Sequence, residues 1–321
     1  MKRILPLLAS VLLGACEKQP AAPSQSQSPA GQHGTIGVSL LTLDNPFFKV
    51  IGDEIAKTGA AQGYQSLVVS GDKDVARQSN QIKDFIVKKV AAIVLSPCDS
   101  RSIVPVIQEA NAAGIPVITV DVPCSEPGVK LLTQIATDNF GGGKQAADAM
   151  IEALGASGGK IAVLHFKQVE SCQLRVKGFR EVIEAHNASG KPKIEIVSEL
   201  ESGGAKDMGF KATEDILQAH PEIRGIFAIN DPAALGARAA LEKAGQADRI
   251  LIIGFDGQPE GKQAIKLGKI HADPIQFPEQ MGAKAVDAIV RHSKGESIPP
   301  TILIPTSLYR KADGLNDPSL K

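Results

Sequence analysis

The body of the chain, from Thr35 onward, alternates short apolar runs with longer segments in which apolar residues recur at helical spacing. Several of the apolar runs are continuous rather than alternating with polar residues, as is typical of strands buried on both faces. The pattern predicts strands at residues 36–41, 65–69, 91–95, 116–120, 160–164, 194–197, 225–229 and 250–254. Strands of this kind, separated by helices, indicate an α/β fold with parallel sheets.

The segments between these runs have the length of helices, and glycine closes several of them. Glycine adopts the left-handed backbone conformation that ends many helices, because it has no Cβ to clash. The predicted helices include residues 47–63, 75–88, 102–113, 142–154 and 233–244, and the closing glycines are Gly63, Gly114, Gly155 and Gly245.

The predicted strands divide into two sets, one within residues 35–137 and one within residues 138–276. Each set is large enough for a small doubly wound, Rossmann-like sheet. No Pro- or Ser-rich linker separates the sets. We therefore expect two lobes between which the chain crosses directly, without a tether.

The first residues are typical of a secretory signal rather than of the fold. Lys2 and Arg3 precede an apolar run at residues 4–13, which is shorter than the ~20 residues of a membrane-spanning helix. Two small residues and Cys16 follow, an ending that resembles the bacterial lipoprotein box. Residues 1–16 are therefore predicted to be a signal peptide that ends at a lipidated Cys16; the alternative is an ordinary cleaved signal with an incidental cysteine.

Residues 17–34 are rich in Pro, Ser, Gln and Ala and lack apolar periodicity. Such a segment cannot bury enough surface to offset the entropy of ordering, so we expect a disordered tether. A tether after a lipid anchor would let the folded body stand off a membrane. The expected location is the cell envelope, on the extracytoplasmic (periplasmic) face.

Composition narrows the classes of function. Lys and Arg total 35, as do Asp and Glu, and this balance argues against a nucleic-acid partner. The six His residues lack metal-ligand spacing, and no Gly-x-Ser-x-Gly elbow is present. The glycines at 141–143 precede Lys144 without the spacing of a phosphate loop, so we expect a turn into a helix there. The sequence predicts neither enzyme activity, nor a metal, nor a cofactor.

Polar and aromatic residues gather just after the predicted strands, where open parallel sheets bind ligands. Asn45 and Asn230 stand at helix starts and are first of all N-caps. Asp121 and Asp256 follow strands without such a helix start. Together with Phe47, Phe48 and Phe255, they match a neutral polyhydroxylated ligand, whose hydroxyls need charged or amide partners and whose C–H faces need aromatic planes.

At these residues the sequence resembles the periplasmic ribose-binding-protein group of sugar-transport receptors. The segments that carry the resemblance are TLDNPFF (42–48), IPVITVD (115–121), ATDN (136–139) with GGK (142–144), AIND (228–231), IGFDG (253–257) and QFPEQMG (276–282). The resemblance runs from about Thr35 to about Tyr309 and implies the type I periplasmic binding protein fold. It implies an N-terminal lobe of residues 35–137 plus 277–305, a C-terminal lobe of 138–276 plus 306–321, and a three-crossing hinge.

The resemblance also implies a site in the cleft between the lobes. The aromatic positions are Phe47, Phe48 and Phe255, and the hydrogen-bonding positions are Asn45, Asp121, Arg175, Asn230, Asp256 and Gln276. An Arg fork can hold two adjacent hydroxyls, although Arg175 could instead be a solvated helix residue. Alanine at Arg175 or Asp256 is expected to abolish binding while leaving the melting of the ligand-free protein nearly unchanged.

The chain departs from the ribose pattern at several positions. Val122 stands where the group often has Arg, Ser96 replaces an Asn, and Leu41 replaces a Ser. A second-lobe aromatic would fall within residues 201–204, which contain none. The fold therefore carries over, whereas the ligand could equally be another pentose, a hexose or a polyol.

Three cysteines remain in the body of the chain. Cys98 and Cys124 follow strands that should be neighbours, so a disulfide between them and a pair of free thiols are both open. Cys172 precedes Arg175 by three residues and is expected near the rim of the second lobe. A nucleophilic role for it is not expected, because no His-plus-acid set is evident.

Four functions compete. The first is a monomeric receptor that captures a monosaccharide or polyol and delivers it to the permease of an ABC importer; the second is a sugar-sensing module that feeds chemotaxis or signalling partners. A sugar-responsive transcription regulator would begin with a helix-turn-helix, whereas this chain begins with a signal and a polar tether. An α/β enzyme would have to show turnover of its ligand. The sequence favours the first function.

Overall fold

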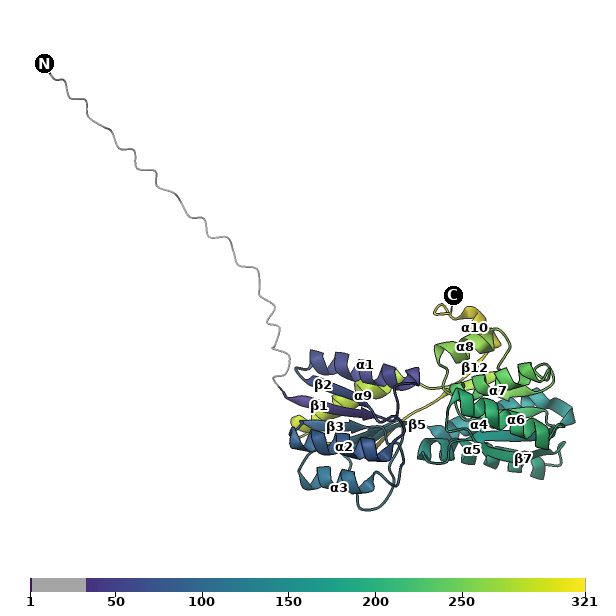
Figure 1. Ribbon diagram of the computed structural model, residues 1–321, viewed down its shortest axis with the longest axis horizontal. Helices are drawn as coiled ribbons and strands as arrows, with labels where there is room; N and C mark the ends of the chain where they lie inside the picture. Colours follow the sequence, from purple (N-terminus) through teal and green to yellow (C-terminus); the bar gives the residue numbers. More distant parts are fainter. Residues whose placement is uncertain (2–32, 321) are drawn as a thin grey trace.

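The computed structural model describes Met1 and residues 33–320. The predicted signal peptide with Cys16, and nearly all of the predicted tether, lie outside the described residues. The chain forms two α/β lobes side by side, with purple and blue segments in one and teal and green segments in the other (Figure 1). The α/β fold with two parallel-sheet lobes is thus confirmed.

The first lobe has a six-stranded, wholly parallel sheet in the order β11-β5-β4-β3-β1-β2. Its strands are β1 (Thr35–Leu40), β2 (Gln65–Ser70), β3 (Ala92–Leu95), β4 (Val117–Val120), β5 (Thr133–Thr137) and β11 (Thr301–Ile304). Its helices are α1 (Pro46–Ala61), α2 (Val75–Val87), α3 (Val104–Ala112) and α9 (Pro278–Ser293). Consecutive side chains of β3 pack into the hydrophobic cores on opposite faces of the sheet: Val94 packs with α1, and Leu95 packs with α2 and α3. Helices therefore cover both faces of this sheet.

The second lobe repeats this plan in the order β12-β10-β9-β8-β6-β7, and only β12 runs antiparallel to its neighbour. Its strands are β6 (Gly159–His165), β7 (Ile194–Glu201), β8 (Gly225–Ala228), β9 (Leu251–Ile253), β10 (Ala272–Ile275) and β12 (Ser307–Arg310). Its helices are α4 (Asn139–Leu154), the 3-10 turn η1 (Gly155–Ser157), α5 (Glu170–Ala188), α6 (Lys206–Ala219), α7 (Asp231–Lys243), α8 (Pro259–Lys266) and α10 (Lys311–Asn316). Here α4 and α5 pack together, as do α6 and α7.

The chain passes between the two sheets three times, from β5 to α4, from β10 to α9 and from β11 to β12. The helices of the first lobe therefore include α9, which packs beside α1 and is yellow-green among purple and blue elements (Figure 1). Two of the crossings are joined where the Thr137 hydroxyl donates to Oε1 of Gln276 at 2.5 Å. At the third crossing, the Thr306 hydroxyl donates to Oε1 of Gln145 at 3.0 Å.

The eight strands predicted from the sequence are all present, as β1–β4 and β6–β9, and the four closing glycines have positive φ angles between 58° and 78°. None of the helices in the described part of the chain combines the length and apolar character needed to cross a bilayer. Residues 33–320 also hold no cluster of three or more His, Cys, Asp or Glu side chains suited to a metal ion.

Candidate ligand-binding cleft

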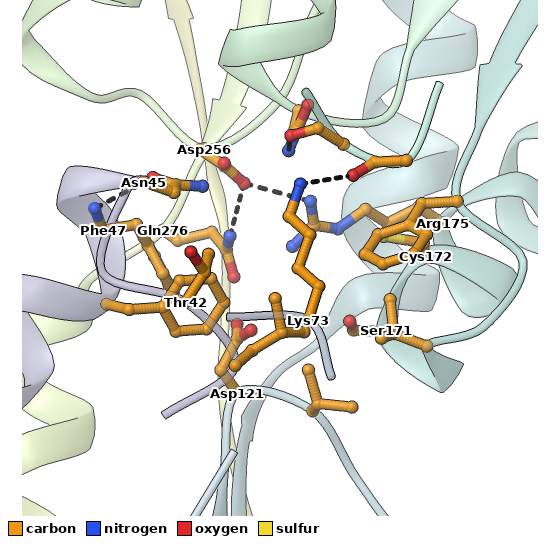
Figure 2. Close-up of a pocket in the computed structure, with 18 residues that line it drawn as sticks. Thr42, Asn45, Phe47, Lys73, Asp121, Ser171, Cys172, Arg175, Asp256 and Gln276 are labelled. Carbon is orange, nitrogen blue, oxygen red and sulfur yellow. Dashed lines mark hydrogen bonds and ion pairs between the residues drawn. The ribbon is translucent and has the colours of Figure 1, made fainter. Parts of the chain in front are cut away.

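A cavity lies between the lobes and is lined by residues of both. Figure 2 shows side chains from the carboxyl-terminal strand ends of both lobes converging on it. Eight of the nine ligand positions that the sequence suggests line this cavity: Asn45, Phe47, Phe48, Asp121, Arg175, Asn230, Asp256 and Gln276.

Arg175 is the central cation of the cavity and is only 3% exposed. Its Nε donates to Oδ1 of Asn139 at 2.8 Å, and its Nη1 donates to the Ile229 carbonyl at 2.6 Å and to Oδ1 of Asp256 at 3.0 Å. Its guanidinium carbon lies 3.9 Å from the centroid of the Phe255 ring. These contacts fix the plane of the fork and leave Nη2 without a protein acceptor among the described residues, so Nη2 can donate to a ligand.

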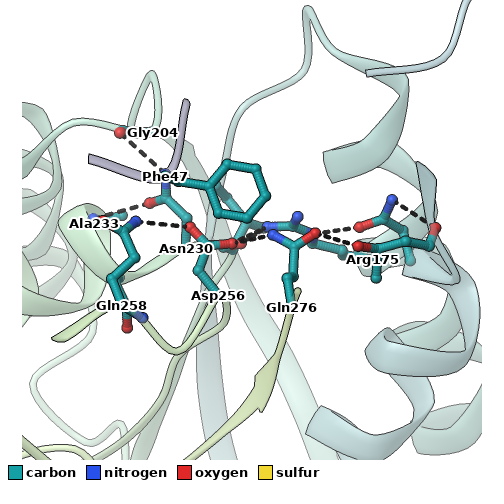
Figure 3. A network of polar contacts seen from close by, with 12 residues as sticks. Phe47, Arg175, Gly204, Asn230, Ala233, Asp256, Gln258 and Gln276 are labelled. Carbon is teal, nitrogen blue, oxygen red and sulfur yellow. Dashed lines mark hydrogen bonds and ion pairs between the residues drawn. The ribbon is translucent and has the colours of Figure 1, made fainter. Parts of the chain in front are cut away.

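Asp256 collects hydrogen bonds from three side chains around the same point (Figure 3). Besides Arg175, Nε2 of Gln276 donates to its Oδ1 at 2.6 Å and Nε2 of Gln258 donates to its Oδ2 at 3.3 Å. Burial raises the pKa of Asp256, although the Arg175 charge and the two amides act in the opposite direction. The carboxylate is held in one orientation, and of its roughly four lone-pair sites one, on Oδ2, remains for a ligand hydroxyl.

Asp121 contrasts with Asp256, because it lacks such partners. It follows β4 in a tight turn with φ of 63°, and it is 4% exposed. Its Oδ1 is buried and accepts no hydrogen bond from the described residues, and its side chain points into the cavity (Figure 2). Burial raises its pKa to about 7, opposed by the charge of Arg175. A buried carboxylate oxygen without a donor is costly, so this position demands a donor from outside the protein chain.

The two asparagines have helix-capping roles as well as cavity positions. Asn45 accepts from the Phe47 amide at 3.0 Å, while its own amide nitrogen makes no hydrogen bond to the described residues and can donate to a ligand. Asn230 accepts from the Ala233 amide at 3.0 Å and donates to the Gly204 carbonyl at 3.1 Å (Figure 3). Asn230 thus uses one of its two amide protons within the second lobe, and the other has no acceptor among the described residues.

Aromatic surface comes from both lobes. The rings of Phe47 and Phe48, in the first turn of α1, meet edge to face with centroids 5.4 Å apart, and both line the cavity. Phe166, just after β6, lines it from the second lobe. The aromatic rings can cover C–H faces of a ligand while the carboxylates and Arg175 bind its hydroxyls.

Glycines in α4 and α5 place Arg175 beneath the cavity. A Cβ on Gly143 would lie 2.0 Å from the Arg175 carbonyl oxygen, and one on Gly178 would lie 2.1 Å from that of Phe140. The two helices therefore touch backbone to backbone. The turn expected at residues 141–143 is wrong: Asp138 caps α4 by accepting from the Gly141 amide at 2.9 Å, and the glycines form its first turns.

We predict that Gly143→Ala separates α4 from α5 and displaces Arg175, because a methyl group cannot occupy space held by a carbonyl oxygen. Overpacking of this kind costs typically ~1–3 kcal/mol of stability. Thermal melting and sugar titration of the variant should both show losses. Asp148→Ala, on the exposed side of α4, is the control and should change neither; unaltered melting and binding in Gly143→Ala would contradict the close helix contact.

Residues 36–297 match the family model described as the periplasmic binding protein domain. The chain belongs to this family. Within it, the ribose import binding protein of Bacillus subtilis is 34% identical over 305 residues, which cover 94% of this chain and 95% of that protein. The D-apiose import binding protein of Actinobacillus succinogenes is 32% identical over 255 residues, or 79% of this chain and 80% of that one.

Solved structures agree with this assignment. A periplasmic solute-binding protein of an ABC transporter from Actinobacillus succinogenes, with bound D-allose, superimposes with a TM-score of 0.80 at 28% identity. The match covers 88% of this chain and 100% of that chain. The relatives are thus import proteins that bind solutes, and the resemblance seen in the sequence is confirmed.

Two features of this periplasmic binding protein bear on the expectations from the sequence. Phe255 does not line the cavity: it is fully buried, with its ring against Arg175 and Gly142, so it supports the guanidinium from behind. Of the two alternatives left open for Cys98 and Cys124, the structure shows the free thiols, and both are buried. Sγ of Cys98 lies 3.6 Å from the Leu41 carbonyl, at the end of β1, whereas Cys124 packs in the core beneath α3.

Cys172 lines the cavity as a buried thiol, and burial raises its pKa to about 12. It therefore presents a small apolar surface rather than a nucleophile.

Sequence reasoning missed other residues of the cavity wall. Phe166 lies beside Gly204, so an aromatic from β6 stands near the position where residues 201–204 lack one. Lys73 enters from the loop between β2 and α2, which was not among the strand ends singled out from the sequence, and no sequence pattern gives the direction of its side chain. Thr42 and Ser171 also line the cavity, and generic small polar residues carry no distinguishing signal.

A second pair of carboxyl groups lies behind Asp256. Asp231 and Asp273 are buried within the second lobe, and Oδ2 of Asp231 accepts from the backbone amide of Gln258 at 2.6 Å. Burial and the neighbouring carboxylate raise the pKa of Asp231, and burial raises that of Asp273 to about 6.

Proposed function

We propose that this protein captures a neutral monosaccharide or related polyol between its lobes and delivers it to an ABC importer. The unpaired Asp121 carboxylate in the interlobe cavity is the observation that carries the proposal. Hydroxyl groups are the donors that satisfy such an oxygen without bringing a second charge into a site where Arg175 and Asp256 already neutralise one another. The named relatives bind ribose, apiose and allose, which have this chemistry.

The distribution of donors and acceptors supports a polyhydroxylated ligand. Asp121 and Asp256 accept, while Nη2 of Arg175 and the amide nitrogen of Asn45 donate. A sugar hydroxyl does both, so a ring with several hydroxyls can meet all four groups at once. Hydrogen bonds to charged groups are worth roughly 1.5–3 kcal/mol each, which makes two or three of them sufficient for selective capture.

Contacts across the cleft support closure over the ligand. The Ser125 hydroxyl of the first lobe donates to Oε1 of Glu170 in the second at 2.7 Å, and the Glu170 amide donates to the Ser100 hydroxyl at 3.0 Å. A ligand that contacts both lobes favours the arrangement in which these contacts form. A permease that recognises the closed arrangement would accept only loaded protein. The import roles of the relatives favour transport over the signalling alternative.

The periplasmic location of the family fits an anchored receptor, and we propose that Cys16 carries the lipid and that the protein acts as a monomer. Mass spectrometry of the mature N-terminus should find a lipid-modified Cys16 after removal of residues 1–15. A mature protein that begins at a different residue, without a lipid, would contradict the proposed anchor.

A thermal-shift screen tests the function. The purified mature protein is heated with D-ribose, D-apiose, D-allose or myo-inositol, and with sodium chloride as a blank. A ligand at 100-fold over its dissociation constant adds about 2.7 kcal/mol of stability. We expect at least one sugar or polyol to raise the melting temperature by several degrees. No shift from these compounds or from a wider set of pentoses, hexoses and polyols would contradict the proposal.

A further inference from the structure

Lys73 occupies an unusual place at the edge of the cavity. It lies in the loop between β2 and α2, and its amide donates to the Leu41 carbonyl at 2.9 Å. Asp72 and Lys73 have φ angles of 51° and 60°, in the left-handed region that is unfavourable for a residue with a Cβ. Asp74 then caps α2 by accepting from the Ala76 amide at 2.8 Å. The loop is therefore held in a strained form that directs Lys73 toward the second lobe.

The Lys73 side chain crosses the cleft, as Figure 2 shows. Its Nζ donates to the Gly203 carbonyl of the second lobe at 2.8 Å and lies 5.8 Å from the centroid of the Phe166 ring. We name this contact between Lys73 and Gly203 the Lys73 bridge. An ammonium carries three protons, and the bridge uses one of them. The others have no acceptor among the described residues.

The Lys73 bridge stands at the boundary between two spaces. Lys73, Thr42, Asn45 and Gly204 line both the inner cavity and a wider groove that opens outward between the lobes. The negative groups that influence the ammonium, Asp44 and Asp207, lie on the outer side and are exposed. Among the described residues of the first lobe, Lys73 is the one cation that lines the inner cavity. The residue after Asp121 at the end of β4 is the apolar Val122.

Resting on the proposed function, we propose that Lys73 contacts the ligand and determines its specificity. It donates to the ligand hydroxyl or ring oxygen nearest the cleft mouth while its bridge to Gly203 holds the lobes together. The Lys73 ammonium thus couples recognition of one ligand oxygen to the closing of the two lobes. A sugar that places an oxygen at this point gains a charge-assisted hydrogen bond, and one that places a C–H group there leaves the ammonium unpaired.

The other interlobe contacts provide a natural control. Ser125 joins Glu170 across the cleft, yet neither residue lines the inner cavity. Loss of the Ser125 hydroxyl weakens closure for every ligand alike, whereas loss of the Lys73 ammonium acts on each ligand according to its oxygen at the mouth. The two substitutions therefore separate a residue that only joins the lobes from one that also reads the ligand.

The test compares unaltered protein, Lys73→Met and Ser125→Ala by calorimetry with D-ribose, D-apiose, D-allose and myo-inositol. For sugars that bind the unaltered protein best, Lys73→Met should weaken binding by roughly 10- to 100-fold, with a matching rise in dissociation rate. For weaker members the loss should be smaller, so the order of affinities changes. Ser125→Ala should lower all affinities by a common factor of less than about threefold.

Three results would overturn the inference. Affinities within about twofold of the unaltered protein for Lys73→Met would show that the ammonium does not contact the ligand. Equal losses for all ligands would reduce the Lys73 bridge to a contact between lobes. Should the unaltered protein bind no member of the panel or of the wider screen, the proposed function fails first and the inference falls with it. Melting of the ligand-free variants, with Lys73→Gln as a second substitution, excludes misfolding as the cause.

Discussion

Replacing Arg175 with methionine is expected to abolish sugar binding and to lower the free energy of unfolding of the second lobe by about 3–5 kcal/mol. The loss arises because removal of one partner leaves the Asp256 carboxylate buried without its counter-ion. Asn139 and the Ile229 carbonyl also lose their donor. Sugar titration and thermal melting of the variant measure the two effects.

Arg180→Met is the matched control. It lies on the same helix, α5, but its ion pair with Glu199 is at the surface, with 41% of the Arg180 side chain exposed. Ion pairs at the surface contribute little to the free energy of unfolding, so the sugar affinity and the melting temperature should stay close to those of the unaltered protein. The sequence led us to expect an unchanged melt for alanine at Arg175; its burial overturns that expectation. Full binding by Arg175→Met would contradict the cleft assignment itself.

Replacing Asp121 with asparagine is expected to have opposite effects on stability and binding. The ligand-free variant should melt several degrees higher, because a buried unpaired carboxylate is replaced by a neutral amide. Its affinity for the sugar should fall roughly 10-fold or more, since a bond to an amide oxygen replaces one to a charged group. Asp84→Asn, at an exposed carboxylate on α2 away from the cleft, should change neither.

The same substitution has a defined pH dependence. Burial raises the pKa of Asp121 to about 7, against about 3.9 in the unfolded chain. Because the folded-state pKa is raised, the contribution of Asp121 to stability is fully present below about pH 4 and is lost as pH rises through 7. The advantage of Asp121→Asn should therefore grow from pH 5 to pH 8. Sugar affinity of the unaltered protein should rise between pH 6 and pH 8, whereas that of the variant should stay level; parallel profiles would contradict this role.

Much of the fold could be predicted because buried parallel strands leave continuous apolar runs, and positive-φ glycines mark helix ends. The strands that the runs did not indicate are β5, β10, β11 and β12. β10 contains Asp273 and Pro274 and reads as a loop, and β11 and β12 flank the third crossing with exposed residues. Their identity as strands depends on the neighbours with which they pair, which a local pattern does not report.

The site was predictable to the extent that it depends on strand ends. Asp121 and Asp256 follow strands in both the sequence and the structure, so the rule for parallel sheets brings them to one place. Phe255 was misplaced because a residue adjacent to Asp256 points to the opposite side of the chain, and only packing against Gly142 reveals its support of Arg175. Lys73 was missed because a strained loop sets its direction.

The most direct test of the account is a crystal structure of the protein with the sugar that gives the largest thermal shift. We predict that the sugar lies between the lobes, covered by Phe47, with one hydroxyl donating to Asp121 and adjacent hydroxyls within hydrogen-bond distance of Arg175 and Asp256. A sugar bound at another surface, with the Asp121 carboxylate still lacking a donor, would contradict the claim that this cavity is the binding site.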